Sequence, residues 1–211
     1  MIYKCLGCIT LEKLRVLHLF EADFNLIIGL MFGRRAMYHA ADNQRIHAGQ
    51  YCKPSGECPD VILTKILHNH MTWLTKTALG QFECDATACF DRIVMLFVLL
   101  CYISIGAPKS ACQMWEQALT NIVHSVKTAY GESTGSYAST PDSPIIGPGQ
   151  GSQGGPTACT MVTSTLLKGM DRLAHGVRFC SPAMTLLYHV TSKMFVDDNT
   201  NYTNDFLRWL H

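Results

Sequence analysis

An α+β fold is expected for this chain of 211 residues, and three observations indicate it. Several segments repeat apolar residues at helical spacing, as Ile62, Ile66 and Met71 do. Short apolar segments of strand length alternate with them, among them residues 79–85 and 192–196. Hydrophobic residues make up 48% of the chain and charged residues 16%, which is enough to bury a core. The chain is therefore one folded domain, alone or with part of a second, and not a disordered protein.

The first half of the chain alternates predicted strands and helices. A short, partly alternating apolar segment predicts a strand, and a longer one ending in the basic residues Arg34 and Arg35 predicts an amphipathic helix. A loop with two prolines leads into the next helical period, and a strand that contains Asp85 follows. These segments are residues 14–20 (strand), 24–40 (helix), 54–59 (loop), 61–76 (helix) and 79–85 (strand).

The second half predicts three helices, a glycine-rich segment and a final strand. The longest apolar run, residues 93–105, is shorter than the roughly 20 residues that a bilayer requires and ends at a Gly-Ala-Pro break, so we expect a buried helix and no membrane span. The strand carries an acidic pair, Asp197 and Asp198, at its end. The segments are residues 91–105 (helix), 109–126 (helix), 131–156 (Gly, Ser, Thr and Pro), 157–174 (helix) and 192–196 (strand).

Charge and cysteine content restrict the classes of function. The formal charge of +1 gives no global basic field, so a nucleic acid would have to be held by local basic groups or by parts of a longer protein. Ten cysteines are spread over a chain without a signal peptide, which favours reduced thiols in an intracellular protein, nuclear or cytoplasmic. Zinc remains an alternative at Cys5 and Cys8, completed by Cys52 with Cys58 or His47.

The acidic pair is the main candidate for chemistry. Adjacent aspartates repel each other unless a cation lies between them. A third carboxylate, Asp85, ends another predicted strand, and three carboxylates suit two Mg²⁺ ions in phosphoryl transfer. The glycine-rich run GPGQGSQGGP allows two interpretations. Its composition is that of a linker, but it leads directly into a helix, where it would let the backbone approach a phosphate or a base pair closely.

These residues together resemble a known family. Asp85 with Phe90 and Asp91, then GxxQGxxxGP from Gly147 to Pro156, then Phe195-Val-Asp-Asp198, follow the order and spacing of motifs A, B and C of reverse transcriptases, particularly those of non-LTR retrotransposons. Two upstream segments, residues 15–23 and 50–56, resemble the fingers motifs RPISLLxxxxK and QxGFxxGRS more loosely. Val16 replaces the usual proline and Asn25 the usual lysine, and the GRS element has become Ser55-Gly56-Glu57. The resemblance covers about residues 11–204.

The resemblance implies a right-hand polymerase, with residues 1–78 as partial fingers and 79–211 as palm. A small antiparallel palm sheet flanked by helices would bring Asp85, Asp197 and Asp198 together around two Mg²⁺ ions, with Mn²⁺ as an alternative and the carbonyl of Ala86 as an extra ligand. The implied reaction joins a dNTP to the 3′-hydroxyl of a DNA primer on an RNA template. Only 13 residues follow Asp198, so the thumb and the other retroelement domains are expected to be missing.

The resemblance also implies roles for residues outside the metal cluster. Phe90 would exclude a 2′-hydroxyl, against the alternative of a core phenylalanine. Gln150 with Gly149 and Gly151 would line the nascent base pair, against the alternative of a turn only. Arg15, with Lys13 as a second candidate, would contact the triphosphate, against the alternative of a solvated charge. Four further residues take no part in binding or catalysis at this point. Asp91 is expected to cap a helix, Cys84 and Cys89 are expected to be packing residues, and Glu83 has no assigned role.

Two further functions stay open at this point. The altered fingers motifs and the low positive charge favour a truncated, catalytically inactive retroelement remnant that at most binds nucleic acid. RNA-templated RNA synthesis is disfavoured by Val196, because polymerases of that class usually carry glycine before the acidic pair.

Overall fold

The computed structural model describes residues 2–3, 14–15, 17–86, 89–142, 146–173, 176–181, 185, 187–196 and 198–203. The chain forms two compact units, and each of them combines two separate parts of the sequence. Unit 1 comprises Met1–Ala36 and Ala88–Ala158, and unit 2 comprises Met37–Thr87 and Cys159–His211. The two units are defined by the contacts within each of them and not as fingers and palm. The boundary between fingers and palm that the sequence predicts at residues 78 and 79 therefore stays a prediction.

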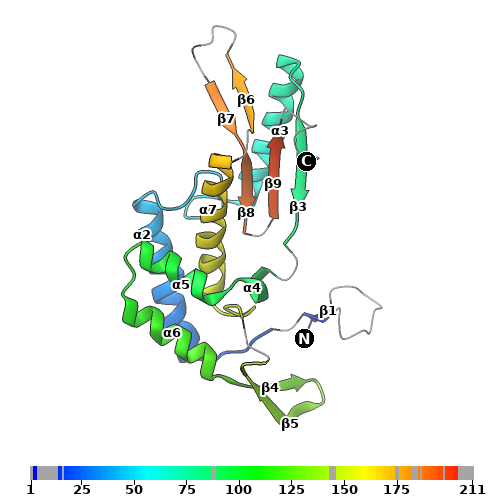
Figure 1. The fold of residues 1–211 in the computed structure, drawn as a ribbon. Coiled ribbons are helices and arrows are strands. Elements are labelled where there is room, and N and C mark those ends of the chain that lie inside the picture. The colour runs from blue at the N-terminus through cyan, green and yellow to red at the C-terminus, as the bar shows by residue number, and fades with distance from the viewer. Residues whose placement is uncertain are drawn as a thin grey trace. The chain divides into compact units, whose positions relative to one another are not determined.

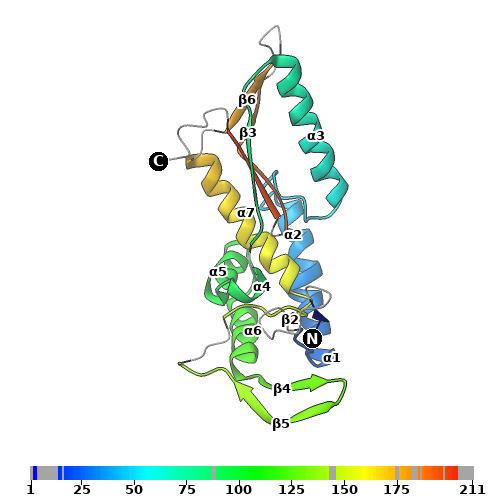
Figure 2. The ribbon, with the colours of Figure 1, turned by 90° about the vertical axis from the view of Figure 1, so that its right-hand side faces the viewer.

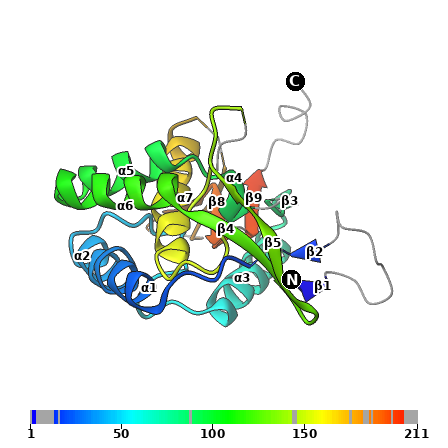
Figure 3. The same ribbon diagram turned by 90° about the horizontal axis from the view of Figure 1, so that it is seen from below.

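Unit 1 is mainly helical and carries a two-stranded hairpin. Its core joins three aromatic rings: Phe32 lies 4.5 Å from Trp115 and 5.2 Å from Tyr102, centroid to centroid, and the Tyr102 hydroxyl donates to the Phe32 carbonyl at 2.8 Å. Figure 3 shows α5 and α6 side by side, with the β4–β5 hairpin following α6. Its elements are β1 (Ile2–Tyr3), β2 (Leu14–Arg15), α1 (Ala22–Ile28), the π-helix η2 (Gly29–Arg35), α4 (Cys89–Arg92), α5 (Met95–Ser104), α6 (Lys109–Asn121), β4 (Val123–Thr128) and β5 (Gly131–Ala138).

Four predictions for unit 1 need correction. Of the strand expected over residues 14–20, only Leu14–Arg15 is a strand; residues 17–20 form no element. The helix expected over residues 91–105 is divided into α4 and α5. The helix expected over residues 109–126 ends at Asn121, and β4 follows. The glycine-rich segment begins with a strand, because β5 pairs with β4 from Val123 opposite Ala138 to Thr128 opposite Gly131.

Unit 2 contains the sheet that positions the acidic residues. Strands β3, β9 and β8 pair antiparallel in that order, and β6 pairs antiparallel with β7 (Figure 1). Figure 2 shows α3 and α7 on opposite faces of the three-stranded sheet. The elements are α2 (Ala36–Asp42, whose first residue belongs to unit 1), α3 (Cys58–Thr75), β3 (Gly80–Cys84), α7 (Gly155–Leu173, whose first four residues belong to unit 1), β6 (Val177–Cys180), β7 (Leu187–Val190), β8 (Ser192–Phe195) and β9 (Asp198–Thr203).

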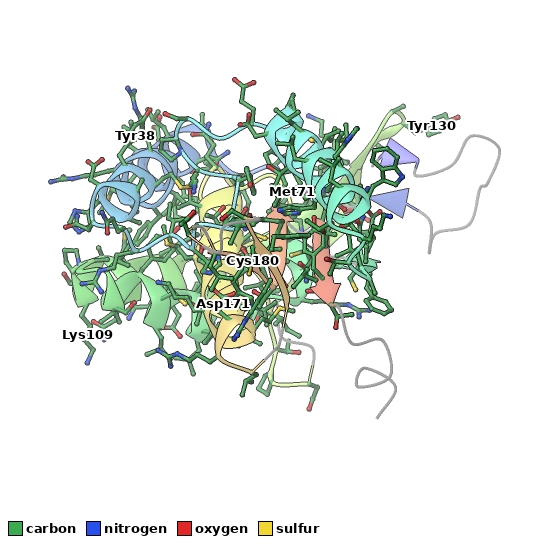
Figure 4. The ribbon with its side chains drawn as sticks, turned by 90° about the horizontal axis from the view of Figure 1, so that it is seen from above. Tyr38, Met71, Lys109, Tyr130, Asp171 and Cys180 are labelled. Atoms are coloured by element: carbon green, nitrogen blue, oxygen red, sulfur yellow. The ribbon has the colours of Figure 1, made fainter. Side chains whose placement is uncertain are left out.

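The core of unit 2 lies between α3 and the strands. Four buried residues form it, Val177, Phe179, Val190 and Tyr202, and Met71 of α3, labelled in Figure 4, packs against them with Leu79. The predicted helix over residues 61–76 is thus confirmed as α3. It begins at Cys58, because Glu57 and Asp60 form a capping box, and Lys76 in a left-handed conformation ends it.

Two further expectations concern the chain as a whole. In the part of the chain that the structure describes, no helix is long and apolar enough to cross a membrane. The eight cysteines that the structure describes are free thiols, while Cys5 and Cys8 lie outside the described residues.

Candidate active site

Strand register places Asp85 and Asp198 at the same end of the sheet. The last pair between β3 and β9 is Cys84 opposite Asn199. Asp85 directly follows Cys84, the last residue of β3, and Asp198 is the first residue of β9, so both aspartates lie at the same end of the two paired strands. Both aspartates are exposed, so their carboxylates are open to solvent at the end of the strands.

The hairpin that carries motif C contains a strained residue. Phe195 of β8 pairs with Asp198 of β9, and Val196 directly after β8 has φ +58°. A β-branched residue in the left-handed region is a conformational outlier, and such outliers concentrate at functional sites. The thiol of Cys159 on α7 donates a hydrogen bond to the Val196 carbonyl at 3.5 Å and so helps to hold this turn. Asp197, the next residue, lies outside the described residues, so the convergence of all three carboxylates stays a prediction.

The donor chemistry of the pair suits a hard divalent cation. Within the described residues the ion pairs are His47–Asp171 and Lys65–Glu83, so neither Asp85 nor Asp198 has a basic partner there. Carboxylates that lie close together without such a partner repel each other, and oxygen ligands are what Mg²⁺ prefers. The described residues contain no group of three or more side chains that could hold a metal ion. The zinc alternative is not tested, because Cys5 and Cys8 lie outside the described residues; His47, one of its candidate ligands, binds Asp171 at 2.6 Å.

Glu83, which had no predicted role, helps to attach α3 to the strand that carries Asp85. It lies two residues before Asp85 and therefore on the same face of the sheet. Its carboxylate accepts from Lys65 at 2.9 Å and from Gln81 at 2.9 Å. The hydrogen bond from Lys65, followed by that from Gln81 and the charge of Lys65, lowers the pKa of Glu83.

Polar side chains that sequence reasoning missed connect the three strands on the α7 face. Asn201 of β9 is their centre: its Oδ1 accepts from Ser192 at 2.5 Å and from Asn199 at 3.2 Å, and its Nδ2 donates to the Cys84 sulfur at 3.9 Å. The Asn199 Oδ1 is buried and has no hydrogen-bond partner among the described residues. Alternation along β9 is the signal that could have revealed this row, since Asn199 and Asn201 share one face.

The glycine-rich loop of motif B lies in unit 1 and is held by the fingers motif. The His18 amide donates to the Gln150 carbonyl at 2.7 Å. Asn25 binds the loop twice, because its Nδ2 donates to the Gly151 carbonyl at 3.2 Å and its Oδ1 accepts from the Gln153 amide at 2.8 Å. Gly149 and Gly151 have φ of +78° and +119°, and added Cβ atoms would lie 2.5 Å and 2.3 Å from His18. The structure thus gives Asn25 a role that its motif position did not predict.

Phe90 packs beside the same loop. A Cβ added to Gly155, the first residue of α7, would lie 3.4 Å from the Phe90 ring, and one added to Gly147 would lie 2.0 Å from the Phe90 carbonyl oxygen. Phe90 is half-buried, so the assignment as a sugar gate stays a prediction. The predicted cap at Asp91 is wrong: Asp91 lies inside α4, and the residue preceding α5 is Val94, which makes no side-chain cap.

The remaining predicted residues have less structural context. Ala86 follows Asp85 and is exposed. The backbone of Arg15 pairs with Ile2 in the β1–β2 ladder, and the structure does not describe its side chain. Lys13 lies outside the described residues. The roles of Ala86 and Arg15 therefore stay predictions.

A cavity of about 720 Å³ lies in unit 1 beside the fingers motif. Residues 17–21 and Phe24 form one side, and the end of α6 with the β4–β5 hairpin forms the other. His124 stacks on its cross-strand partner Tyr137 with ring centroids 5.0 Å apart, and the His18 ring lies 5.0 Å from His124. Burial, followed by the charge of His18, lowers the pKa of His124, so its ring is a neutral, flat surface at pH 7.

Comparisons with known proteins identify the fold. Neither a protein-family profile nor a curated protein sequence matches the chain. Telomerase from Candida albicans, solved in complex with a TWJ fragment of telomeric RNA, matches 87% of this chain at 12% sequence identity with a TM-score of 0.55. Apo telomerase from Candida tropicalis, truncated from its C-terminal domain, matches 87% at 14% identity with a TM-score of 0.48. This chain spans 30% and 34% of those telomerase chains. At this identity the likeness shows the fold alone, which is the α+β fingers and palm fold of a reverse-transcriptase-like polymerase.

Proposed function

We propose that this chain is the fingers and palm part of an RNA-directed DNA polymerase from a retroelement of the non-LTR type. The observation that carries the proposal is the β3–β9 register, which brings the end of β3, followed by Asp85, to the start of β9 at Asp198, near the strained turn at Val196. Acidic side chains that strand ends bring together without a basic partner repel each other, and this repulsion destabilises the fold unless a cation binds. The reaction class that such a site supports is two-metal nucleotidyl transfer.

In this proposal Asp85, Asp197 and Asp198 hold the metal ions, and the Ala86 carbonyl is an extra ligand. Bound Mg²⁺, or Mn²⁺ in its place, would supply Lewis acidity at the primer 3′-hydroxyl and neutralise charge on the triphosphate. The protein's own contribution is geometric. The antiparallel ladder fixes the strand ends next to Asp85 and Asp198, and the hydrogen bonds around Asn201 keep β3, β9 and β8 in register.

The residues of unit 1 would bind the nucleotide and the template. The backbone carbonyl of Gln150 accepts from the His18 amide, and its side chain would line the nascent base pair between Gly149 and Gly151. Phe90 would exclude a 2′-hydroxyl and so select dNTP over rNTP, and Arg15 would bind the triphosphate by a guanidinium fork. The His18, His124 and Tyr137 rings that border the cavity would stack with an unpaired template base.

Metal binding tests the proposal without requiring polymerase activity. We expect Mn²⁺ to bind the wild-type chain with an affinity that falls at least tenfold in Asp85→Asn, Asp197→Asn and Asp198→Asn, measured by electron paramagnetic resonance titration. Asp142→Asn, at an exposed aspartate of unit 1, is the matched control and should bind as the wild type does. Equal Mn²⁺ affinity in all five proteins would refute the metal site.

A specific observation supports the alternative of an inactive remnant. Asn25 stands where the family carries lysine, and both its Nδ2 and its Oδ1 bond to the motif B loop. Because asparagine is uncharged, this position offers no cation for phosphate contact. Primer extension on an RNA template separates the two functions, because an intact metal site with no extension, even after fusion to a thumb from the family, would favour the remnant.

A further inference from the structure

The outward face of α3 in unit 2 has the composition of an interior surface. Its inward residues include His68 and Met71, which contact the strands and their core cluster. Nine residues between Asp60 and Lys76 are exposed. Thr75 lies away from the outward face, and six of the other eight are apolar with exposed fractions of 51% to 76%. None of the eight is Lys, Arg, Asp or Glu. They are Ile62, Leu63, Ile66, Leu67, Asn69, His70, Trp73 and Leu74.

These residues follow the spacing of a helix that pairs with another helix. They form two adjacent rows with steps of four, three and four residues, which is the alternation that places side chains along a helix–helix seam. One row contains residues 62, 66, 69 and 73, and the other contains residues 63, 67, 70 and 74. An antiparallel copy of α3 centred on His68 brings the first row of one helix onto the second row of the other. Ile62 then meets Leu74 of the second copy, and Leu63 meets Trp73.

The charges at the two ends of the face are complementary in this arrangement. The same register sets Asp60 of one copy beside Lys76 of the other, and the two-fold axis repeats this pair at the opposite end. Both residues are exposed, and Asp60 belongs to the capping box while Lys76 ends the helix. In this antiparallel arrangement the positive end of each helix dipole also lies beside the negative end of the other, which is favourable. A parallel arrangement would set Asp60 beside Asp60 and Lys76 beside Lys76.

The exposed apolar area is of the size that a stable interface needs. The six apolar side chains leave on the order of 700 Å² per copy open to solvent, close to the roughly 800 Å² that each partner buries in a typical specific interface. Monomeric proteins rarely expose a continuous apolar patch that large.

We propose that α3 is a self-association surface, through which two copies of this chain pair antiparallel about a two-fold axis near His68. The partner is a second copy and not a charged ligand, because the face is uncharged, self-complementary and bordered by opposite charges at its two ends. This inference is independent of the proposed polymerase activity, since α3 carries none of the predicted metal or nucleotide residues.

Sedimentation equilibrium of the whole 211-residue chain tests the surface. We expect a monomer–dimer equilibrium for the wild type, weakened at least tenfold by Leu67→Glu and by Ile66→Lys, which set like charges against an apolar partner near the axis. Leu187→Glu, at an exposed leucine of β7, is the matched control and should dimerise as the wild type does. A wild type that stays monomeric at about 100 μM, or a control that fails as completely as Leu67→Glu, would overturn the proposal.

A charge exchange tests the antiparallel register. Lys76→Asp should weaken the dimer by about three- to tenfold, because it sets two pairs of aspartates together. Adding Asp60→Lys to the same chain should restore the affinity, provided that circular dichroism shows α3 intact after loss of the capping carboxylate. A parallel dimer predicts no recovery, so failure of the double variant with α3 intact would refute the register.

Discussion

Phe90 illustrates how one side chain can serve both packing and selectivity. Its ring lies against the first residue of α7, and its carbonyl lies against Gly147 in the motif B loop. If the ring also limits the space beneath a bound sugar, Phe90→Ala in an active, thumb-complete protein should admit ribonucleotides at least tenfold more readily. Steady-state incorporation of dNTP and rNTP measures this ratio. Unchanged discrimination would leave Phe90 with a packing role only.

Burial of His68 makes the stability of unit 2 depend on pH. The ring is 1% exposed, stacks on Phe179 and lies 3.2 Å from the Tyr188 hydroxyl through its Nε2, while its Nδ1 has no partner among the described residues. Burial, followed by the charge of Lys193, lowers the pKa of His68 from 6.5 to about 4. The native state therefore favours the neutral imidazole, whereas the unfolded chain takes up a proton already near pH 6.5.

Stability should thus be fully present above pH 6.5 and fall as the pH drops towards 4, by up to about 3 kcal/mol. Urea unfolding at pH 4.5 and 7 measures the difference between the two conditions. His68→Phe keeps a ring in the core and should reduce this difference, whereas His70→Gln, on the exposed face of the same helix, should leave it unchanged. An identical pH dependence in wild type and His68→Phe would contradict the assignment.

Two glycines, one directly before α7 and one within it, allow a matched test of packing. A Cβ added to Gly154 would lie 2.8 Å from Ile28 and 3.0 Å from Trp115, whereas one added to Gly169, within α7, meets nothing within 4 Å. Gly154→Ala should therefore destabilise unit 1 by about 1–3 kcal/mol. Gly169→Ala should stabilise the chain by about 0.5–1 kcal/mol, because alanine favours the helix. Equal effects on thermal unfolding would show that the loop relaxes around Gly154.

Helical periodicity anticipated elements better than it anticipated their ends. The spacing of apolar residues predicted α3 and α7 to within a few residues, because one face of each helix packs on the sheet. It failed at Val123, where the chain leaves α6 and becomes a strand that exists only because β5 pairs with it. The π-helical turn Gly29–Arg35 was also invisible to periodicity. Gly29 and Gly33 of this π-helix leave room for Gln153. Because Gln153 lies at least 120 positions later in the chain, the local sequence does not predict this contact.

The whole chain should be a poor polymerase even with a complete metal site. Affinity for a primer and template comes largely from cationic contacts to phosphates, and this chain has 17 basic against 16 acidic residues. We expect weak, salt-sensitive binding and little extension of a primer on an RNA template at about 0.15 M salt. A fusion to a thumb from the family should extend it further, and Asp197→Asn provides the blank. Processive synthesis by the unfused chain would show that fingers and palm suffice.

The sequence by itself determined the chemistry that this chain can offer. The order of Asp85, the glycine-rich loop and the Asp197–Asp198 pair indicated a reverse-transcriptase-like palm, and the α+β fold agrees with it. Tertiary structure alone decided which strand ends lie together. Asp85 and Asp198 are more than a hundred positions apart, and only the pairing of β3 with β9 brings them to the same end of the sheet. The same holds for Asn25 and the motif B loop, because hydrogen bonds between distant segments depend on strand register and packing, which local residue patterns do not encode.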